Sequence, residues 1–221
     1  MAYDWQFSLL LQYWPVFVRG AIVTLEITLG GALLGLVVGL IVGVSKGSRV
    51  APIRWICSAY VELIRGTPAL VQIIWIYYCF PIIFGVQMSG VVTMVVALGL
   101  HSAAYVAEIF RAGINAVDRG QVAASQALGM SPLLAMRRII LPQAIQKMLP
   151  PFINEFASLL KLTTLGSTIA VYELLHESNN LIAAIYRPLE VYTTLAVIFF
   201  VITYPFIFLA QRLERKLRSR G

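Results

Sequence analysis

Charged side chains are scarce in this sequence. Only 12% of its 221 residues are charged and 59% are hydrophobic, whereas an ordinary soluble domain has about 25% charged and about 45–50% apolar residues. A soluble fold of this length could not cover so much apolar side chain. The apolar residues also form runs longer than the ~20 residues that cross a bilayer core. The scarcity of charge therefore predicts an integral membrane protein surrounded by the lipid bilayer.

Cysteine and histidine are equally scarce, at two residues each. Cys57 and Cys79 lie in apolar segments, without CxxC spacing and with no histidine close enough in sequence to suggest a metal site. We interpret both cysteines as packing residues, and we predict no metal and no catalytic residue. The GxxxxGK[ST] loop that holds the phosphates of ATP is absent as well. We therefore expect no cofactor in this chain, and any ATP and magnesium that drive it must be bound by another subunit.

Five long apolar segments predict five membrane-spanning helices, at about 19–44, 56–84, 91–110, 151–171 and 191–210. The formal charge of +7 does not indicate nucleic-acid binding, because no soluble basic module is present. Most basic residues instead follow the first, third and fifth spans: Lys46, Arg49, Arg54, Arg111, Arg119, Arg137, Arg138, Lys147, Arg212, Arg215, Lys216, Arg218 and Arg220. The positive-inside rule then predicts an outside N-terminus and a cytoplasmic C-terminus.

We interpret residues 1–221 as a single transmembrane domain whose lead-in is 1–18. Within the lead-in, 3–14 mix aromatic, apolar and polar side chains, which is typical of an interfacial helix on the outer surface; a frayed lead-in is the alternative. In the second span, Pro68 predicts a kink or break. In the first span, a glycine at every fourth residue favours close packing of a neighbouring helix. These glycines are Gly31, Gly35, Gly39 and Gly43.

The segment 111–150, between the third and fourth spans, is too long for a turn. Residues 121–129 form an alanine-rich run that favours a helix and ends at Gly129, a residue that can adopt the left-handed cap conformation. Ser131 and Pro132 then supply the N-cap and the first-turn proline of another helix. This helix, turn and helix on the cytoplasmic side either dock in a groove of a soluble partner or form a simple surface loop.

The same segment resembles the EAA loop of ABC importer permeases. The likeness is carried by Ala123, Ala124, Gly129, Ile139, Leu141 and Pro142, although the usual glutamate is missing. Five segments, in the right order along the chain, are similar to the polar amino-acid permeases of the histidine and glutamate/aspartate systems: 65–68, 104–114, 127–131, 140–144 and 186–192. Each segment alone is a weak signal, but together they are specific and extend over nearly the whole chain.

This resemblance implies an all-α subunit with five transmembrane helices, of the type I ABC importer permease fold, in the bacterial cytoplasmic (inner) membrane. The implied partners are a cytoplasmic ABC ATPase dimer, a second permease subunit that is identical or related, a periplasmic or extracellular amino-acid-binding protein, and an amino-acid substrate. Coupling to the ATPase is then expected at seven residues of the loop. They are Ala123, Ala124, Ala127, Leu128, Gly129, Met130 and Ser131.

Polar residues inside a membrane usually face a cavity or a partner, because lipid solvates them poorly. In the fourth span, Asn154, Ser158 and Lys161 recur at helical spacing. We expect the substrate path to use residues of the first and fourth spans: Glu26, Thr28, Glu155, Ser158, Thr163 and Thr164. Glu155 can alternatively bond Lys161 and nearby backbone. The resemblance implies an acidic residue at the next position after Lys161, where this chain has Leu162.

Two further polar positions have structural interpretations. His101 is expected to bond a neighbouring helix, and Glu108 with Arg111, three residues later, to form an ion pair at a cytoplasmic helix end. An ATP-independent secondary amino-acid transporter would also carry acids in the membrane, but such folds usually contain inverted repeats, which we do not find here. We therefore predict the transmembrane subunit of an ABC importer that forms the path for a polar amino acid and is coupled to separate ATPase subunits.

Overall fold

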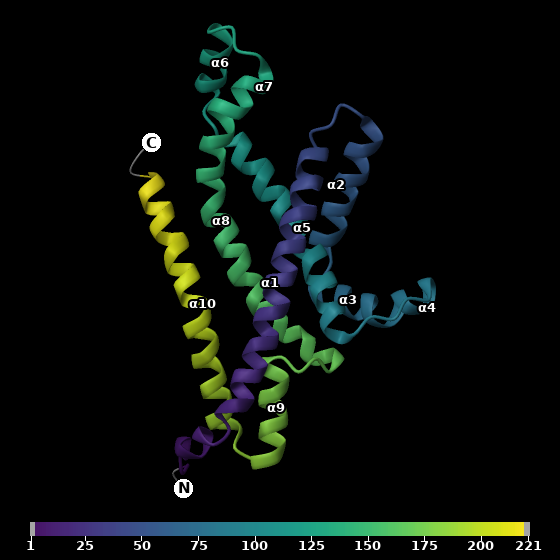
Figure 1. Cartoon of the computed structure of the whole chain (residues 1–221), viewed down its shortest axis with the longest axis vertical. Helices are drawn as coiled ribbons and strands as arrows, with labels where there is room; N and C mark the ends of the chain where they lie inside the picture. The colour runs from purple at the N-terminus through teal and green to yellow at the C-terminus, as the bar shows by residue number, and fades with distance from the viewer. Residues whose placement is uncertain (1–2, 219–221) are drawn as a thin grey trace.

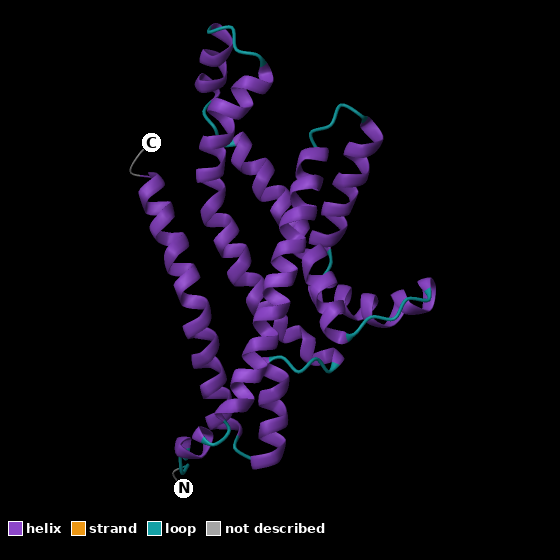
Figure 2. Ribbon diagram, in the orientation of Figure 1, coloured by secondary structure: helices purple, strands orange, loops and turns teal. Residues whose placement is uncertain are grey.

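A computed structural model describes residues 3–218, and all secondary structure in that range is helical (Figures 1 and 2). A short 3-10 helix, η1 (Phe7–Leu11), leads into α1 (Trp14–Ser45), whose second residue, Pro15, suits a helix start because it has no N–H to leave unpaired. The first long helix therefore begins at Trp14, inside the predicted lead-in 1–18. The first two residues of the predicted lead-in lie outside the described residues.

The second predicted span is broken and not straight. Helix α2 (Ala51–Gly66) ends before Pro68, and α3 (Ala69–Ile74), a π-helical turn η2 (Trp75–Cys79) and α4 (Phe80–Phe84) follow. The two halves are bent by 108°, because Pro68 has no N–H and forces extended backbone on Thr67. The predicted break at Pro68 is confirmed, and α4 projects sideways from the bundle (Figure 1).

Helix α5 (Gly90–Asn115) packs along almost the whole length of α1. The glycine repeat of α1 forms this contact, since Gly35 faces Ser102 and Gly39 faces Val106. A Cβ atom added at Gly39 would lie 2.6 Å from the Cβ of Val106. The two backbones can approach this closely because the glycines have no side chain.

The chain then forms a helical hairpin and returns through the bundle. The hairpin consists of α6 (Arg119–Ala127) and α7 (Pro132–Ala135), and a π-helical turn η3 (Met136–Ile140) joins it to α8 (Leu141–Leu162). A 3-10 helix η4 (Thr163–Ile169), α9 (Leu174–Ile185) and α10 (Pro188–Arg218) complete the described chain. The fourth predicted span, 151–171, needs correction, because the α-helix starts ten residues earlier, at Leu141, and ends at Leu162.

Three helices are long and apolar enough to cross a membrane, namely Trp14–Ser45, Gly90–Asn115 and Pro188–Leu217. A fourth span is obtained if α2 to α4 count as one bent crossing. Helix α8 is not among them, since it carries Lys147, Glu155 and Lys161 in 22 residues. By length and composition alone, three or four helices of the described chain qualify as spans, so this measure does not confirm the predicted five.

The main core lies where α1, α3, α5, α8 and η4 meet. Its buried members include Ile27, Ile73, Leu98, Leu159 and Ile169. At one end of the bundle, α9 packs against α1 and α10; at the other end, the α6–α7 hairpin extends beyond the long helices (Figure 1). We refer to these as the α9 end and the hairpin end.

Candidate functional site

The α6–α7 hairpin is closed by a tight, fully hydrogen-bonded turn. The N–H of Met130 donates to the carbonyl of Ser125 (3.1 Å) and the N–H of Gly129 donates to the carbonyl of Gln126 (2.9 Å). This pair of bonds is the Schellman arrangement, which requires left-handed backbone just after the helix. Gly129 supplies it with a φ of +70°, the conformation predicted from the sequence. The turn is therefore fixed by the chain itself, without a partner.

Each helix of the hairpin begins at a capping residue. Asp118 accepts a hydrogen bond from the N–H of Gly120 (2.5 Å), and Ser131 accepts one from the N–H of Leu134 (3.4 Å), as its predicted N-cap role requires. Inside the hairpin, Ser125 and Ala135 are buried.

Most of the hairpin surface is open. Of the seven residues expected to contact an ATPase, Met130 is half-buried and the other six are exposed: Ala123, Ala124, Ala127, Leu128, Gly129 and Ser131. Two large apolar side chains stand out, since Leu128 is 78% exposed and Leu133 is 79% exposed. An apolar pair at the tip of a rigid projecting hairpin is well suited to insertion into a groove on another protein.

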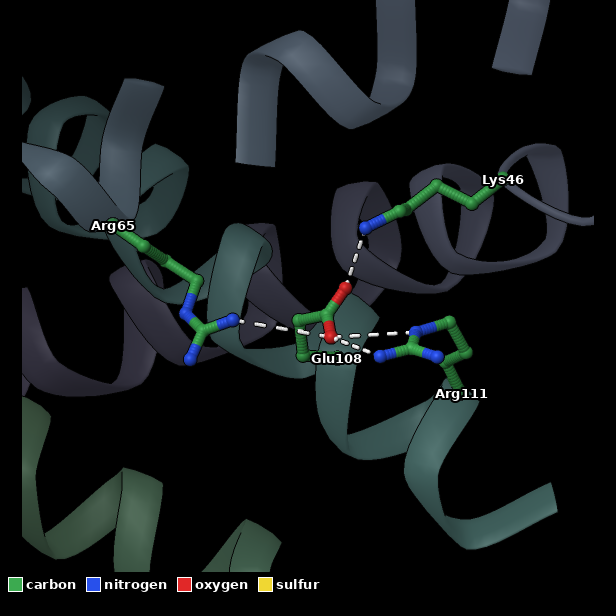
Figure 3. Close-up of polar contacts among 4 residues, drawn as sticks. All are labelled: Lys46, Arg65, Glu108 and Arg111. Atoms are coloured by element: carbon green, nitrogen blue, oxygen red, sulfur yellow. Dashed lines mark hydrogen bonds and ion pairs between the residues drawn. The ribbon is translucent and has the colours of Figure 1, made fainter. Parts of the chain in front are cut away.

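An ion cluster ties three helices together near the hairpin end (Figure 3). The carboxylate of Glu108 on α5 accepts hydrogen bonds from Lys46 Nζ at the end of α1 (2.5 Å) and from Arg111 Nη2 (2.8 Å). Arg65 on α2 lies 3.8 Å from the same carboxylate and 5.5 Å from the centre of the Tyr105 ring. The predicted Glu108–Arg111 pair is confirmed, while Lys46 and Arg65 were not predicted as its partners.

A cavity of about 450 Å³ opens beside this cluster, between α2, α5 and α8. Its lining includes Arg65, Tyr105 and Glu108 together with Lys147 and Pro151 of α8. Lys147 donates a hydrogen bond to the carbonyl of Ala116. The single carboxylate of Glu108 is surrounded by Lys46, Arg65 and Arg111. Lys147 is a fourth cation, in the lining of the cavity. The cavity and the ion cluster beside it therefore carry excess positive charge, which attracts anionic groups.

One face of α8 presents polar groups to the outside of the chain. Asn154, Ser158 and Lys161 are exposed and recur at the helical spacing predicted. Glu155, at the edge of this face, is partly buried, and its carboxylate interacts with the hydroxyl of Ser102 on α5. Such a row is poorly solvated by lipid, so it must face water or another protein.

The structure separates the remaining path candidates. Thr163 is buried and donates to the carbonyl of Leu160 (2.7 Å), whereas Thr164 is half-buried and donates to the carbonyl of Lys161 (2.8 Å). On α1, Thr28 is buried and donates to the carbonyl of Thr24 (2.7 Å), while Glu26 is exposed on a different face. Ser158 therefore shares the open face of α8, and neither Thr28 nor Thr163 reaches it.

Two polar residues of the bundle centre are bonded across helices. His101 of α5 lies 3.0 Å from the amide oxygen of Gln72 on α3, as expected for a histidine that bonds a neighbouring helix. Gln72 was not predicted as the partner of His101, because the two residues lie 29 positions apart in the sequence. Within residues 3–218, no group of three or more histidine, cysteine, aspartate or glutamate side chains is placed to hold a metal ion.

Comparison with known proteins identifies clear relatives. Residues 31–219 match the family model described as binding-protein-dependent transport system inner membrane component. The chain is 35% identical to the arginine transport system permease protein ArtQ of Bacillus subtilis, over 96% of this chain and 97% of that protein. It is also 35% identical to the glutamine transport system permease protein GlnP of Escherichia coli, with 99% of each chain covered.

Solved structures give the same picture. A crystal structure of an amino acid ABC transporter with histidines contains a chain that is 40% identical, covers 98% of this chain and 100% of its own length, and superposes with a TM-score of 0.90. The methionine ABC transporter MetNI, at 23% identity, covers 93% of this chain and 98% of its own and has a TM-score of 0.77, which is a likeness of fold.

Proposed function

We infer the following from the premise that the chain belongs to the family of binding-protein-dependent transport system inner membrane components. It is a membrane-embedded permease subunit of an ABC importer for amino acids. Relatives are named for arginine, glutamine and cystine, and we propose a polar amino acid as the substrate. The complete transporter would also contain a second permease subunit, a cytoplasmic ATPase dimer that binds ATP and magnesium, and a secreted amino-acid-binding protein.

The observation that carries this proposal is the α6–α7 hairpin. Its turn is closed by its own backbone, its tip exposes Leu128 and Leu133, and it connects directly to α5 and α8. In the proposed mechanism the ATPase binds the hairpin, and closure of the ATPase dimer when ATP binds moves α5 and α8. The chain itself does not hydrolyse ATP; it forms the substrate path, and its helices move.

For the membrane topology we propose five crossings, with α2 to α4 as one bent crossing and α8 as another. The loop after α1, the hairpin and the end of α10 lie toward the same end of the molecule (Figure 1). Lys46, Arg49, Arg54 and the hairpin arginines lie at that end, which supports a cytoplasmic hairpin end and an outside N-terminus in the bacterial inner membrane. Arg220, one of the predicted cytoplasmic cations, lies outside the described residues.

The open polar face of α8 is our candidate for the wall of the substrate path. Asn154, Ser158 and Lys161 offer hydrogen-bond donors and acceptors together with a positive charge. Paired with a second permease, this face would line water between the two subunits. Glu155, held at Ser102, would then adjust the position of α8 against α5 and contact the substrate only if it turns outward.

Uptake by the reconstituted transporter tests this proposal. The permease is placed in proteoliposomes with the ATPase and the binding protein encoded in neighbouring reading frames, and uptake of radiolabelled amino acids is measured. We expect uptake that requires ATP and is blocked by vanadate. Uptake driven by an ion gradient without ATP would support the secondary transporter instead, and conductance without ATP would support a channel.

The hairpin is tested in the same assay with Ala124→Asp and Gly129→Val. A buried contact with the ATPase does not accept an unpaired charge, and valine is strained at a φ of +70°. We expect each variant to reduce uptake about tenfold or more and to weaken copurification of the ATPase. Unchanged assembly and uptake in both variants would remove the hairpin from the mechanism.

A further inference from the structure

The break between α2 and α3 leaves backbone carbonyls without their helical partners. Pro68 has no N–H for the carbonyl of Ile64, and the carbonyl of Leu63 lies in the last turn of α2, where helical bonding ends. Unsatisfied carbonyls in an apolar surrounding are costly. Side chains must therefore satisfy them if the bend is a fixed feature.

Two side chains do so. The hydroxyl of Thr67 donates to the carbonyl of Leu63 (2.9 Å), and the amide nitrogen of Gln72 lies 2.8 Å from the carbonyl of Ile64. The same nitrogen lies 3.1 Å from the carbonyl of Thr67 and 2.8 Å from its hydroxyl oxygen. We call residues 63–72, closed in this way, the knee. It is held by hydrogen bonds and so differs from a flexible hinge.

The orientation of Gln72 also fixes His101. Because the amide NH₂ of Gln72 faces carbonyl oxygens, its amide oxygen must face His101 Nδ1, 3.0 Å away. An oxygen can only accept, so Nδ1 of His101 must carry the proton. This is the less common tautomer of a neutral histidine in water, and the knee selects it.

The helices on both sides of the bend are thereby bonded to α5. Before the bend, the hydroxyl of Tyr60 donates to the carbonyl of Leu100 (2.6 Å), and after the bend Gln72 accepts from His101, the next residue of α5. Arg65, within the knee, reaches Glu108 and Tyr105 of the same helix. Helix α5 in turn leads directly into α6 of the hairpin.

From this geometry we infer that Gln72, oriented by the carbonyls of Ile64 and Thr67 and bonded to His101, is a positioning residue that makes the knee move with α5 as one body. It transmits displacement of the hairpin to Arg65 in the lining of the cavity. The part of the inference that concerns transport depends on the proposed function, while the hydrogen-bond geometry does not.

The geometry is tested by nitrogen NMR on the purified chain in nanodiscs with ¹⁵N-labelled histidine. The chain has only two histidines, so His176→Gln assigns the signals. At a pH where both rings are neutral, we expect His101 to carry its proton on Nδ1 in the unmodified chain and in the Gln87→Met control. In Gln72→Met we expect it to shift to Nε2. A proton on Nε2 in the unmodified chain would overturn the inference.

Transmission is tested by measuring uptake and ATP hydrolysis together on the reconstituted transporter. We expect Gln72→Met to lower amino-acid uptake about tenfold, the scale expected when a carbonyl loses its hydrogen-bond partner. ATP hydrolysis should change less than about twofold. Gln72→Glu keeps an oxygen for His101 but has no N–H for Ile64, so it should keep the Nδ1 proton and still lose uptake. Gln87, in an exposed loop, gives the matched control.

A parallel fall of uptake and hydrolysis in both Gln72 variants would mean that Gln72 serves assembly alone. Normal uptake in both variants would mean that the hydrogen bonds of Gln72 are not needed for transport. Either result overturns the inference. If the unmodified transporter showed no ATP-driven uptake, the proposed function would fail, and the tautomer measurement would still decide the geometry.

Discussion

Glu173 is a buried carboxyl at the start of α9, with no exposed surface. It accepts hydrogen bonds from the N–H groups of Leu175 and His176 (2.8 Å each), while the N–H of Leu174 donates to Thr24 of α1 (3.2 Å). Burial raises the pKa of Glu173 to about 7, although both N–H bonds act in the opposite direction. This residue therefore titrates in the physiological range at the junction of α9 and α1.

Stability should depend on pH through this carboxyl. A raised folded-state pKa means that the folded chain binds more protons than the unfolded chain between pH ~4.5 and ~7, so the free energy of unfolding falls as the pH rises through that window, by up to about 3 kcal/mol. Above pH ~7 this contribution is constant. We expect Glu173→Gln to flatten the dependence in detergent unfolding measured from pH 5 to 8. Glu177→Gln, one turn along α9, is the control and should keep the slope.

At the residue scale, local rules predicted local geometry and missed distant partners. The left-handed Gly129, the N-cap Ser131 and the break at Pro68 follow from the conformational limits of glycine, serine and proline, and all are present. The pairing of Lys46 with Glu108 joins residues 62 positions apart, and Gln72 bonds His101 of another helix. No sequence period encodes such pairs, because folding alone brings them together.

At the scale of elements, the contact between α1 and α5 is the most extensive helix pairing of the described chain. The glycine repeat predicted a close neighbour but could not identify it, since a row of small residues fits any partner of suitable shape. The structure supplies the partner through Ser102 and Val106. The boundaries of the fourth predicted span were wrong at both ends, because Pro150 and Pro151 lie inside α8 while the apolar run continues beyond it.

Substitution of Gly39 should therefore destabilise the bundle. In Gly39→Ala the new methyl group would lie 2.6 Å from Val106 and 2.7 Å from the backbone oxygen of Ala103, and such overpacking costs about 1–3 kcal/mol. Gly47→Ala meets only the carbonyl of Val44, at 3.3 Å, and should change stability by less than about 0.5 kcal/mol. Thermal unfolding in detergent compares the two. Equal stability of both variants would contradict close packing at Gly39.

At the scale of the whole molecule, the sequence predicted a helical membrane protein and its family correctly. The number of crossings was harder to predict, because length and hydropathy identify three or four helices as spans and do not identify α8 as one. A polar helix can cross a membrane when its neighbours and a water-filled path shield it, which a count of apolar residues does not detect. The positive-inside rule remains the basis of the proposed orientation.

Labelling with a membrane-impermeant thiol reagent tests that orientation. In a chain carrying Cys57→Ser and Cys79→Ser, single cysteines replace Asn180 on α9 and Gln126 in the hairpin, both exposed. We expect the Asn180→Cys variant to react in intact cells and the Gln126→Cys variant to react only in inverted vesicles. The reverse pattern would place the hairpin outside the cell and end its proposed role.

The polar face of α8 has a consequence for biosynthesis. A helix with Lys147, Glu155 and Lys161 partitions poorly from the translocation channel into lipid on its own, since each charge at mid-membrane costs about 2.5–3.5 kcal/mol on the insertion scale. The strongly apolar α1 and α5 are synthesised first and α10 last. We therefore expect α8 to remain beside α5 during synthesis and to enter the bilayer fully only when α10 packs against it.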